Sequence, residues 1–94
     1  MQLIELHERL IDCYEAVQAD RMALARMRLN GVVSLLRPIQ DDYADIKIAY
    51  IKIMDVSKVL KDSPNRKNTR SWAMGQIHEM IDLADSWINC RNWV

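Results

Sequence analysis

Two histidines and two cysteines are the residues of this sequence best suited to act as bases, nucleophiles or soft metal ligands. Of the two imidazoles, only His78 has a carboxylate at helical spacing, since Asp82 follows it four residues later. A carboxylate in that position can orient the imidazole of a general base. The pair falls toward the polar side of the helix expected there, so we interpret it as a solvated surface pair and not as a catalytic dyad.

His7, Cys13, His78 and Cys90 are also the candidate ligands of a zinc ion. Neither His–Cys pair has the close spacing of structural zinc motifs, and side chains six residues apart on a helix point about 120° away from each other. The sequence contains no Glu-x-x-His pair, Walker loop, dinucleotide-binding fingerprint or Gly-x-Ser-x-Gly elbow. It therefore predicts a protein that is not an enzyme, binds no metal and carries no cofactor.

The composition indicates one small helical domain. The chain has 94 residues, which we assign to a single domain over residues 1–94. Its 13 basic and 13 acidic residues give a formal net charge of zero, which disfavours general attraction to nucleic acid or anionic lipid. Half of the residues are hydrophobic, and only two glycines and two prolines occur. This composition excludes collagen-like and disordered chains and predicts a compact, mostly helical fold.

The N-terminal segment has neither the basic start nor the unbroken apolar core of a signal peptide. Glu5, Glu8 and Arg9 interrupt its apolar residues, and no uncharged run approaches the roughly 18 residues that a membrane span needs. Two cysteines are too few for a disulfide scaffold. We therefore expect reduced, buried thiols, no membrane association and a cytoplasmic protein.

The first third of the chain predicts one long helix. Apolar residues recur here at spacings of three and four, as in a helix that buries one stripe of side chains. The helix spans 2–29 if Asn30-Gly31 forms its C-terminal cap, or 2–36 if it continues to the firmer stop near Pro38. Arg21 interrupts the apolar stripe. We expect its guanidinium either to reach water at the edge of the stripe or to pair with an acidic residue of the second helix.

Two further helices are predicted over residues 38–62 and 69–92. Pro38 is favourable in a first helical turn, and Ser63-Pro64 lies in the clearest loop of the chain. Residues 46–53 also alternate in the manner of a β-strand, but we favour a helix because no partner strand exists elsewhere in the sequence. Short connections between the three helices predict an all-α, antiparallel up-down-up three-helix bundle.

The predicted helices carry more apolar side chains than one three-helix core uses. A second apolar line runs along the first helix, and a flank that contains tryptophan runs along the third. The second helix likewise has apolar residues away from its main face, at Ile48, Ile51 and Val59. Packing of the middle helix on two sides would bury part of this surface; the other interpretation is that these flanks meet in an oligomer or bind a partner. The candidate partner-binding residues are Ile4, Ile11, Met22, Trp72, Leu83, Trp87 and Trp93.

A basic segment, residues 58–70, surrounds the connection before the third helix. It holds five positive charges and a single acidic residue, Asp62, and it suits phosphates or an acidic protein surface. A solvated loop between two helix ends is the other interpretation. The candidate charge-orienting residues are Lys58, Lys61, Arg66, Lys67 and Arg70.

Together these features favour a non-enzymatic, helical protein–protein interaction module that forms a homodimer through its helix faces. Its partner would be a larger protein or protein complex, bound by helix-on-helix burial and oriented by the basic segment. A small nucleic-acid-binding protein that uses residues 58–70 is the alternative. The chain is similar in size and type to small accessory proteins of phages and mobile elements. This resemblance implies a protein that inhibits or modulates a host complex in the host cytoplasm.

Overall fold

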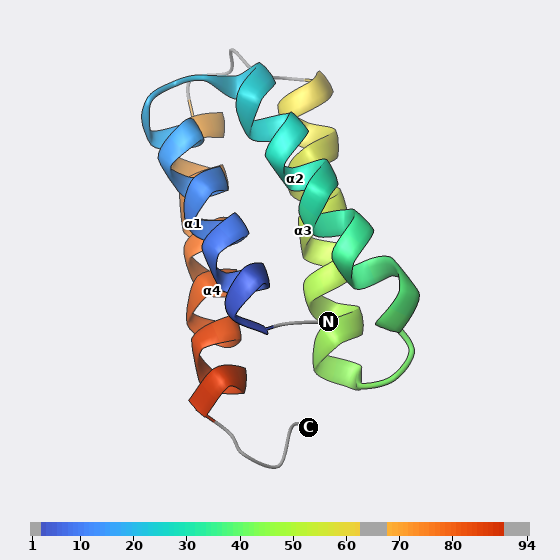
Figure 1. Ribbon diagram of the computed structural model, residues 1–94. Coiled ribbons are helices and arrows are strands. Elements are labelled where there is room, and N and C mark those ends of the chain that lie inside the picture. The colour runs from blue at the N-terminus through green and yellow to red at the C-terminus, as the bar shows by residue number, and fades with distance from the viewer. Residues whose placement is uncertain (1–2, 63–67, 90–94) are drawn as a thin grey trace.

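The computed structural model describes residues 3–62 and 68–89, which form four α-helices, one short 3-10 helix and no β-strand. The helices are α1 (Leu3–Gln18), α2 (Met22–Leu36), η1 (Arg37–Ile39), α3 (Ala44–Asp62) and α4 (Thr69–Asn89). Figure 1 shows the chain running up α1, down α2, up α3 and down α4. The all-α prediction is confirmed, whereas the expected number of three helices is too small for the described residues.

The additional helix arises because the first predicted helix is divided at residues 19–21. Asp20 has a φ of 60°, in the left-handed region that Asp tolerates better than most residues. Its N–H donates to the Val17 carbonyl over 3.0 Å, and the Arg21 N–H donates to the Ala16 carbonyl over 2.9 Å. These two hydrogen bonds form a Schellman motif, which ends a helix. α2 therefore folds back beside α1 instead of extending it.

α2 continues through Asn30-Gly31 and ends at Leu36. Of the two ends expected for the first predicted helix, residue 29 and residue 36, the second is therefore the observed one. Gly31 does not have a positive φ, so it does not act as a left-handed C-terminal cap. Pro38 lies in η1, directly after α2. The stop expected near Pro38 is therefore confirmed.

α3 begins at Ala44, six residues later than the predicted start at residue 38. Residues 37–39 form η1 instead, and the Asp42 N–H donates to the Ile39 carbonyl over 3.0 Å in the turn that follows. Residues 46–53 are helical, so the helix prediction is confirmed for this segment and the strand alternative is wrong. α4 begins at Thr69 as predicted, and residues 90–92 of that predicted helix lie outside the described residues.

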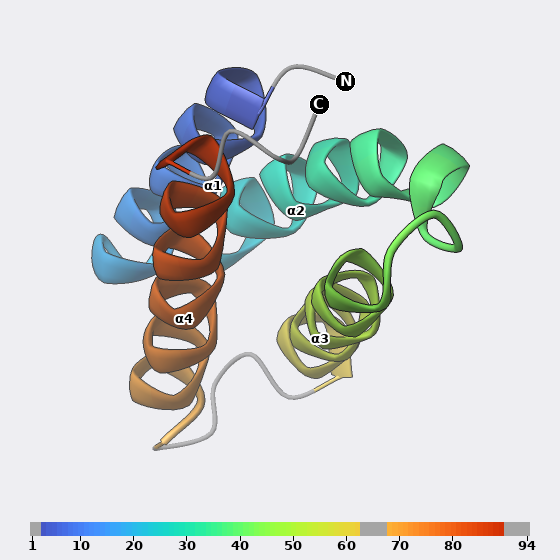
Figure 2. The same ribbon diagram turned by 90° about the horizontal axis from the view of Figure 1, so that it is seen from below.

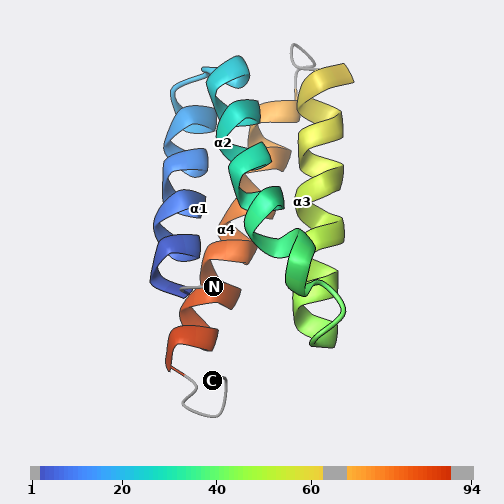
Figure 3. The ribbon, with the colours of Figure 1, turned by 45° about the vertical axis from the view of Figure 1, so that its right-hand side comes forward.

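The helices pack in a ring around a mostly aliphatic core. α1 lies between α2 and α4, and α3 contacts the same two helices from the other side of the molecule (Figures 2 and 3). The largest fully buried side chains include Leu6, Leu29, Leu36, Ile46, Ile53, Leu60 and Ile77. Because α3 packs chiefly against α2 and α4, no helix of the described chain covers the face of α3 that points away from the core. No helix within residues 3–62 and 68–89 combines the length and the apolar character needed to cross a membrane.

Candidate functional site

Several residues predicted to contact a partner belong to the interior of the fold. Trp87 is only 4% exposed and lies in the core. Met22 and Leu83 are half-buried and pack against the same core, and Ile11 is also half-buried. Packing within the chain therefore covers a large part of the apolar flanks, for which the sequence had left open either packing within the chain or binding of a partner.

Ile4 and Trp72 are the predicted partner-binding residues that the structure exposes. Their exposed fractions are 62% for Ile4 on α1 and 39% for Trp72 on α4. Trp93, the remaining member of the predicted set, lies outside the described residues. Of the predicted set, Trp72 is the described aromatic side chain that a partner could reach.

Three further exposed apolar residues lie on α3. The sequence placed two of them, Ile48 and Ile51, away from the main apolar face of the helix but did not include them among the candidate partner-binding residues. Ile48, Ile51 and Met54 are 51%, 50% and 42% exposed, and we refer to them as the α3 outer face. The buried residues of the same helix are Ile46, Ala49, Ile53, Val56 and Leu60. At about 100° per residue, the α3 outer face lies on the side of the helix away from that stripe. The signal in the sequence is the i, i+3 spacing of the three apolar residues between the buried positions.

Charged residues border the α3 outer face in alternating sign. Lys47, Asp55 and Lys58 are all exposed. Lys47 Nζ lies 3.1 Å from Asp41 Oδ1, in a pair whose side chains are 54% and 79% exposed. Asp55 and Lys58 form no ion pair with any residue in 3–62 or 68–89. The surface therefore combines apolar side chains with charges of both signs that remain available for a partner.

Polar contacts on both sides of α3 hold it against its neighbours. Lys52 Nζ lies 2.8 Å from Glu79 Oε2 on α4. On the other side, Arg37 Nε donates to the Tyr50 hydroxyl over 3.4 Å, close to the end of α2. These contacts accompany the packing of the buried residues of α3 against its neighbours and leave its outer face uncovered.

Trp72 and the described part of the basic segment lie at the end of the molecule where α3 finishes and α4 begins (Figure 1). Lys58, Lys61 and Arg70 are exposed there. The other two candidate charge-orienting residues, Arg66 and Lys67, lie outside the described residues. This end of the molecule therefore carries an exposed indole and exposed cationic side chains.

Arg70 also has a structural role. Its Nη2 donates to the backbone carbonyl of Gln18, the last residue of α1, over 2.6 Å. Cationic groups at a helix C-terminus satisfy carbonyls that lack intrahelical partners and interact favourably with the helix dipole. Arg70 thus ties the start of α4 to the end of α1 at the corner where the chain reverses.

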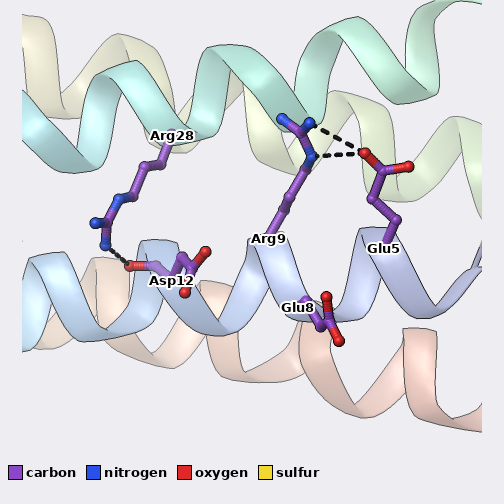
Figure 4. Close-up of a pocket in the computed structure, with 5 residues that line it drawn as sticks. All are labelled: Glu5, Glu8, Arg9, Asp12 and Arg28. Atoms are coloured by element: carbon purple, nitrogen blue, oxygen red, sulfur yellow. Dashed lines mark hydrogen bonds and ion pairs between the residues drawn. The ribbon is translucent and has the colours of Figure 1, made fainter.

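An open pocket of about 340 Å³ lies between α1 and α2 and is lined by charged residues. Figure 4 shows Arg9 reaching from α1 toward α2 and Arg28 reaching from α2 toward α1. Arg9 donates to Glu5 Oε1 through both Nε and Nη2, at 3.2 and 3.0 Å. Arg28 Nη1 donates to the backbone carbonyl of Asp12 over 2.8 Å. Glu5, Glu8, Arg9, Asp12 and Arg28 line the pocket, and none of them is a cysteine, serine or histidine.

Gly31 gives Arg9 the space to lie across α2. A Cβ at this position would be only 2.9 Å from Arg9 Nη1. The absent side chain therefore lets the guanidinium approach the α2 backbone. We conclude that this pocket is a polar contact between two helices, in which both arginines are already bonded within the chain.

The candidate catalytic and metal-binding residues do not converge. His78 Nδ1 lies 3.4 Å from Asp82 Oδ2, and both side chains are well exposed, as predicted for a surface pair. The Tyr14 ring packs beside His78, with 6.1 Å between the ring centroids. Within residues 3–62 and 68–89, no three His, Cys, Asp or Glu side chains are grouped in a way that could hold a metal ion.

Cys13 is buried in the core, and Cys90 lies outside the described residues. Burial raises the pKa of the Cys13 thiol from 9.0 to about 12. The nearby charges of Arg28 and Asp12 change that pKa in opposite directions and are smaller effects than burial. The Cys13 thiol is therefore protonated at neutral pH and is a core side chain, not a nucleophile.

The fold and its surfaces define an all-helical domain with exposed apolar and charged faces. No protein-family model matches the chain. No solved structure matches it either. The proposals below therefore depend on the surfaces of this chain alone.

Proposed function

We propose that the chain is a non-enzymatic, helical protein–protein interaction module that binds a larger protein through the surface around Trp72. The observation that supports this proposal is an indole that is 39% exposed, at the end of the molecule that also exposes Lys58 and Lys61. Tryptophan is enriched among the residues that contribute most to protein binding. Trp87, in contrast, is 4% exposed and contributes to folding.

The charge of the basic segment indicates the kind of surface that fits. Residues 58–70 contain five basic residues and one acidic residue, although the whole chain has a net charge of zero. Opposite charge around an apolar contact increases association rates and orients the partners. An acidic surface with an apolar pocket for the indole is therefore the complementary partner.

The biological setting belongs to the same proposal. A small helical protein that occupies a surface of a larger complex can block or change the activity of that complex without any catalysis. We accordingly assign to this chain the role of an accessory protein, of the type found in phages and mobile elements, that inhibits or modulates a host complex in the cytoplasm.

Affinity capture with substitutions tests this function. Immobilised parent protein is compared with Trp72→Ala, with Lys58→Glu/Lys61→Glu, and with Met27→Ala as a matched control at an apolar site that is 70% exposed on α2. We expect a protein that the parent and the control retain and that both the Trp72 and the lysine variants lose. Circular dichroism confirms that the variants are folded. Equal retention by all four proteins would contradict the assignment of this surface.

The nucleic-acid alternative makes a different prediction in the same experiment. Nucleic acid would raise the 260 nm absorbance of protein purified at low salt, and moderate salt would remove it because phosphate contacts are strongly salt-dependent. The Lys58→Glu/Lys61→Glu variant would then lose nucleic acid and not a protein.

Self-association is the second part of the proposed function. The α3 outer face lies on a different helix from Trp72, so one surface can bind a second copy while the other binds the larger partner. Contiguous apolar patches on small proteins usually mark contact sites. A homodimer through helix faces is therefore compatible with binding at Trp72.

A further inference from the structure

We propose that the α3 outer face binds the α3 outer face of a second copy, with the two helices antiparallel and the two-fold axis at Ile51. This inference deepens the self-association part of the proposed function and rests on it. Its support is the order of apolar and charged residues along α3, which is complementary to itself in this arrangement.

A two-fold axis imposes a simple rule on the contacts. In an isologous antiparallel pair, a residue a given number of positions before the axis meets the residue the same number of positions after it. With the axis at Ile51, the two Ile51 side chains meet each other, and Ile48 meets Met54 of the second copy on both sides of the axis. The three most exposed apolar residues of α3 are thereby all covered, from fractions of 51%, 50% and 42%.

The charges follow the same rule. Lys47 lies four residues before Ile51, and Asp55 lies four residues after it. Lys47 of each copy therefore lies opposite Asp55 of the other copy, which gives two such pairs in the dimer. Lys58 lies opposite the small Ala44 and meets no like charge. Asp55 is free of ion pairs among the described residues, and the pair between Lys47 and Asp41 is well exposed and therefore weak enough to exchange.

Other arrangements of the same two helices lose these matches. In a parallel pair, Lys47 would face Lys47 and Asp55 would face Asp55, which is unfavourable. A shift of the antiparallel register by one turn, or four residues, sets Ile51 opposite either Asp55 or Lys47 and separates Lys47 from Asp55. Charge complementarity therefore selects both the direction and the register.

The supports of α3 within one chain are compatible with such a dimer. Lys52 is engaged with Glu79 on the α4 side, and Tyr50 with Arg37 on the α2 side. Neither contact involves the three apolar residues of the α3 outer face. A second copy can therefore bind without rearrangement of the helices that pack against α3.

Charge reversal tests the register directly. The single variants Lys47→Glu and Asp55→Lys each place like charges opposite each other at both ends of their own dimer. An equimolar mixture of the two variants restores opposite charges at both positions. We expect each single variant to dimerise at least about tenfold more weakly than the parent, and the mixture to recover the parent affinity in sedimentation velocity.

Matched controls accompany these variants. Asp45→Lys makes the same charge change as Asp55→Lys on the same helix, at an exposed position about 120° around α3 from Ile51, and it should leave the dimer unchanged. Ile51→Lys should abolish the dimer, whereas Met27→Lys, at an apolar site on α2 that is 70% exposed, should not. Thermal melts by circular dichroism establish that each variant is folded.

The outcomes separate this inference from the proposed function. A parent chain that stays at 11.0 kDa up to millimolar concentration would overturn the inference, and protein capture through Trp72 could still succeed. A dimer that none of the α3 substitutions affects would overturn the assigned surface. A dimer that Ile51→Lys disrupts and that the charge mixture fails to restore would overturn the register.

Discussion

The buried thiol of Cys13 makes the stability of the protein depend on pH in the alkaline range. The pKa of this thiol is raised from 9.0 to about 12 by burial, so an unfolded chain releases the proton at a lower pH than the folded chain. Because the folded chain holds this proton more tightly, the protonated thiol contributes its full share to the free energy of unfolding below pH 9, and this contribution is lost as the pH rises toward 12.

The size of the effect follows from the two pKa values. At pH 10 the thiol of the unfolded chain is mostly ionised and that of the folded chain is protonated, which lowers the free energy of unfolding by about 1.4 kcal/mol relative to pH 7. Lysine and tyrosine side chains also titrate in this range. The informative quantity is therefore the difference between the parent and a Cys13→Ala variant, in which these other groups remain.

Urea unfolding followed by circular dichroism at pH 7 and pH 10 measures this difference. Replacement of Cys13 by alanine removes packing atoms, so we expect the variant to be less stable at pH 7. We expect its loss of stability between the two pH values to be smaller than that of the parent by about 1.4 kcal/mol. Equal losses in both proteins, or rapid reaction of native Cys13 with a thiol reagent at pH 8, would refute a buried thiol.

Two other positions give sharp predictions for stability. Gly75 is exposed in the middle of α4, and a Cβ there would meet nothing within 4 Å. Gly75→Ala should therefore raise the free energy of unfolding by about 0.5–1 kcal/mol, seen as a higher urea midpoint, and an unchanged midpoint would contradict this expectation. Asp20 has a φ of 60°, so Asp20→Val should cost about 1–2 kcal/mol and lower the melting temperature. Asp20→Gly tolerates that backbone conformation and should be more stable than the valine variant; equal melting temperatures would show that the left-handed residue does not matter.

The sequence was most informative where one helical period continues without interruption. α4 keeps its apolar residues in phase from Ala73 through Ile77 to Ala84, and its predicted start at Thr69 is the observed one. Four of the eight residues 46–53 are β-branched isoleucines, but packing of Ile46, Ala49 and Ile53 on one side makes the helical period prevail over local strand propensity.

The corner at Asp20 was missed because its signal is weak in the sequence. Helix ends of this type usually carry glycine, and here an aspartate adopts the left-handed conformation instead. The apolar stripe also continues across the corner, since α1 and α2 face the same core. The available signal was Asp20-Arg21, two adjacent charged residues within the stripe. Arg21 is exposed at the start of α2 and makes no ion pair with Asp42 or Asp45, so the pairing expected within the chain does not form, and a pair with a partner's carboxylate stays a prediction.

The candidate surfaces were harder to predict than the helices. A period identifies the buried side of a helix, but the sequence alone does not reveal which flanks neighbouring helices cover. Trp87 and Trp72 have the same side chain, and only the packing of α4 separates one that is 4% exposed from one that is 39% exposed. The sequence placed Ile48 and Ile51 away from the main apolar face of their helix, but it did not show that they are exposed, because their exposure depends on the position of α3 at the edge of the ring.

The position of α1 between α2 and α4 has a consequence for the order in which the protein folds during its synthesis. α1 and α2 are neighbours in sequence and can pair as soon as both have left the ribosome. The other side of α1 is covered by α4, which is the last described helix to be synthesised. One side of α1 thus stays uncovered until α4 has been synthesised. Closing the ring brings together α1 and α4, which are far apart in sequence, so this contact forms more slowly than the pairing of α1 with α2 because the loop between the contacting residues is longer.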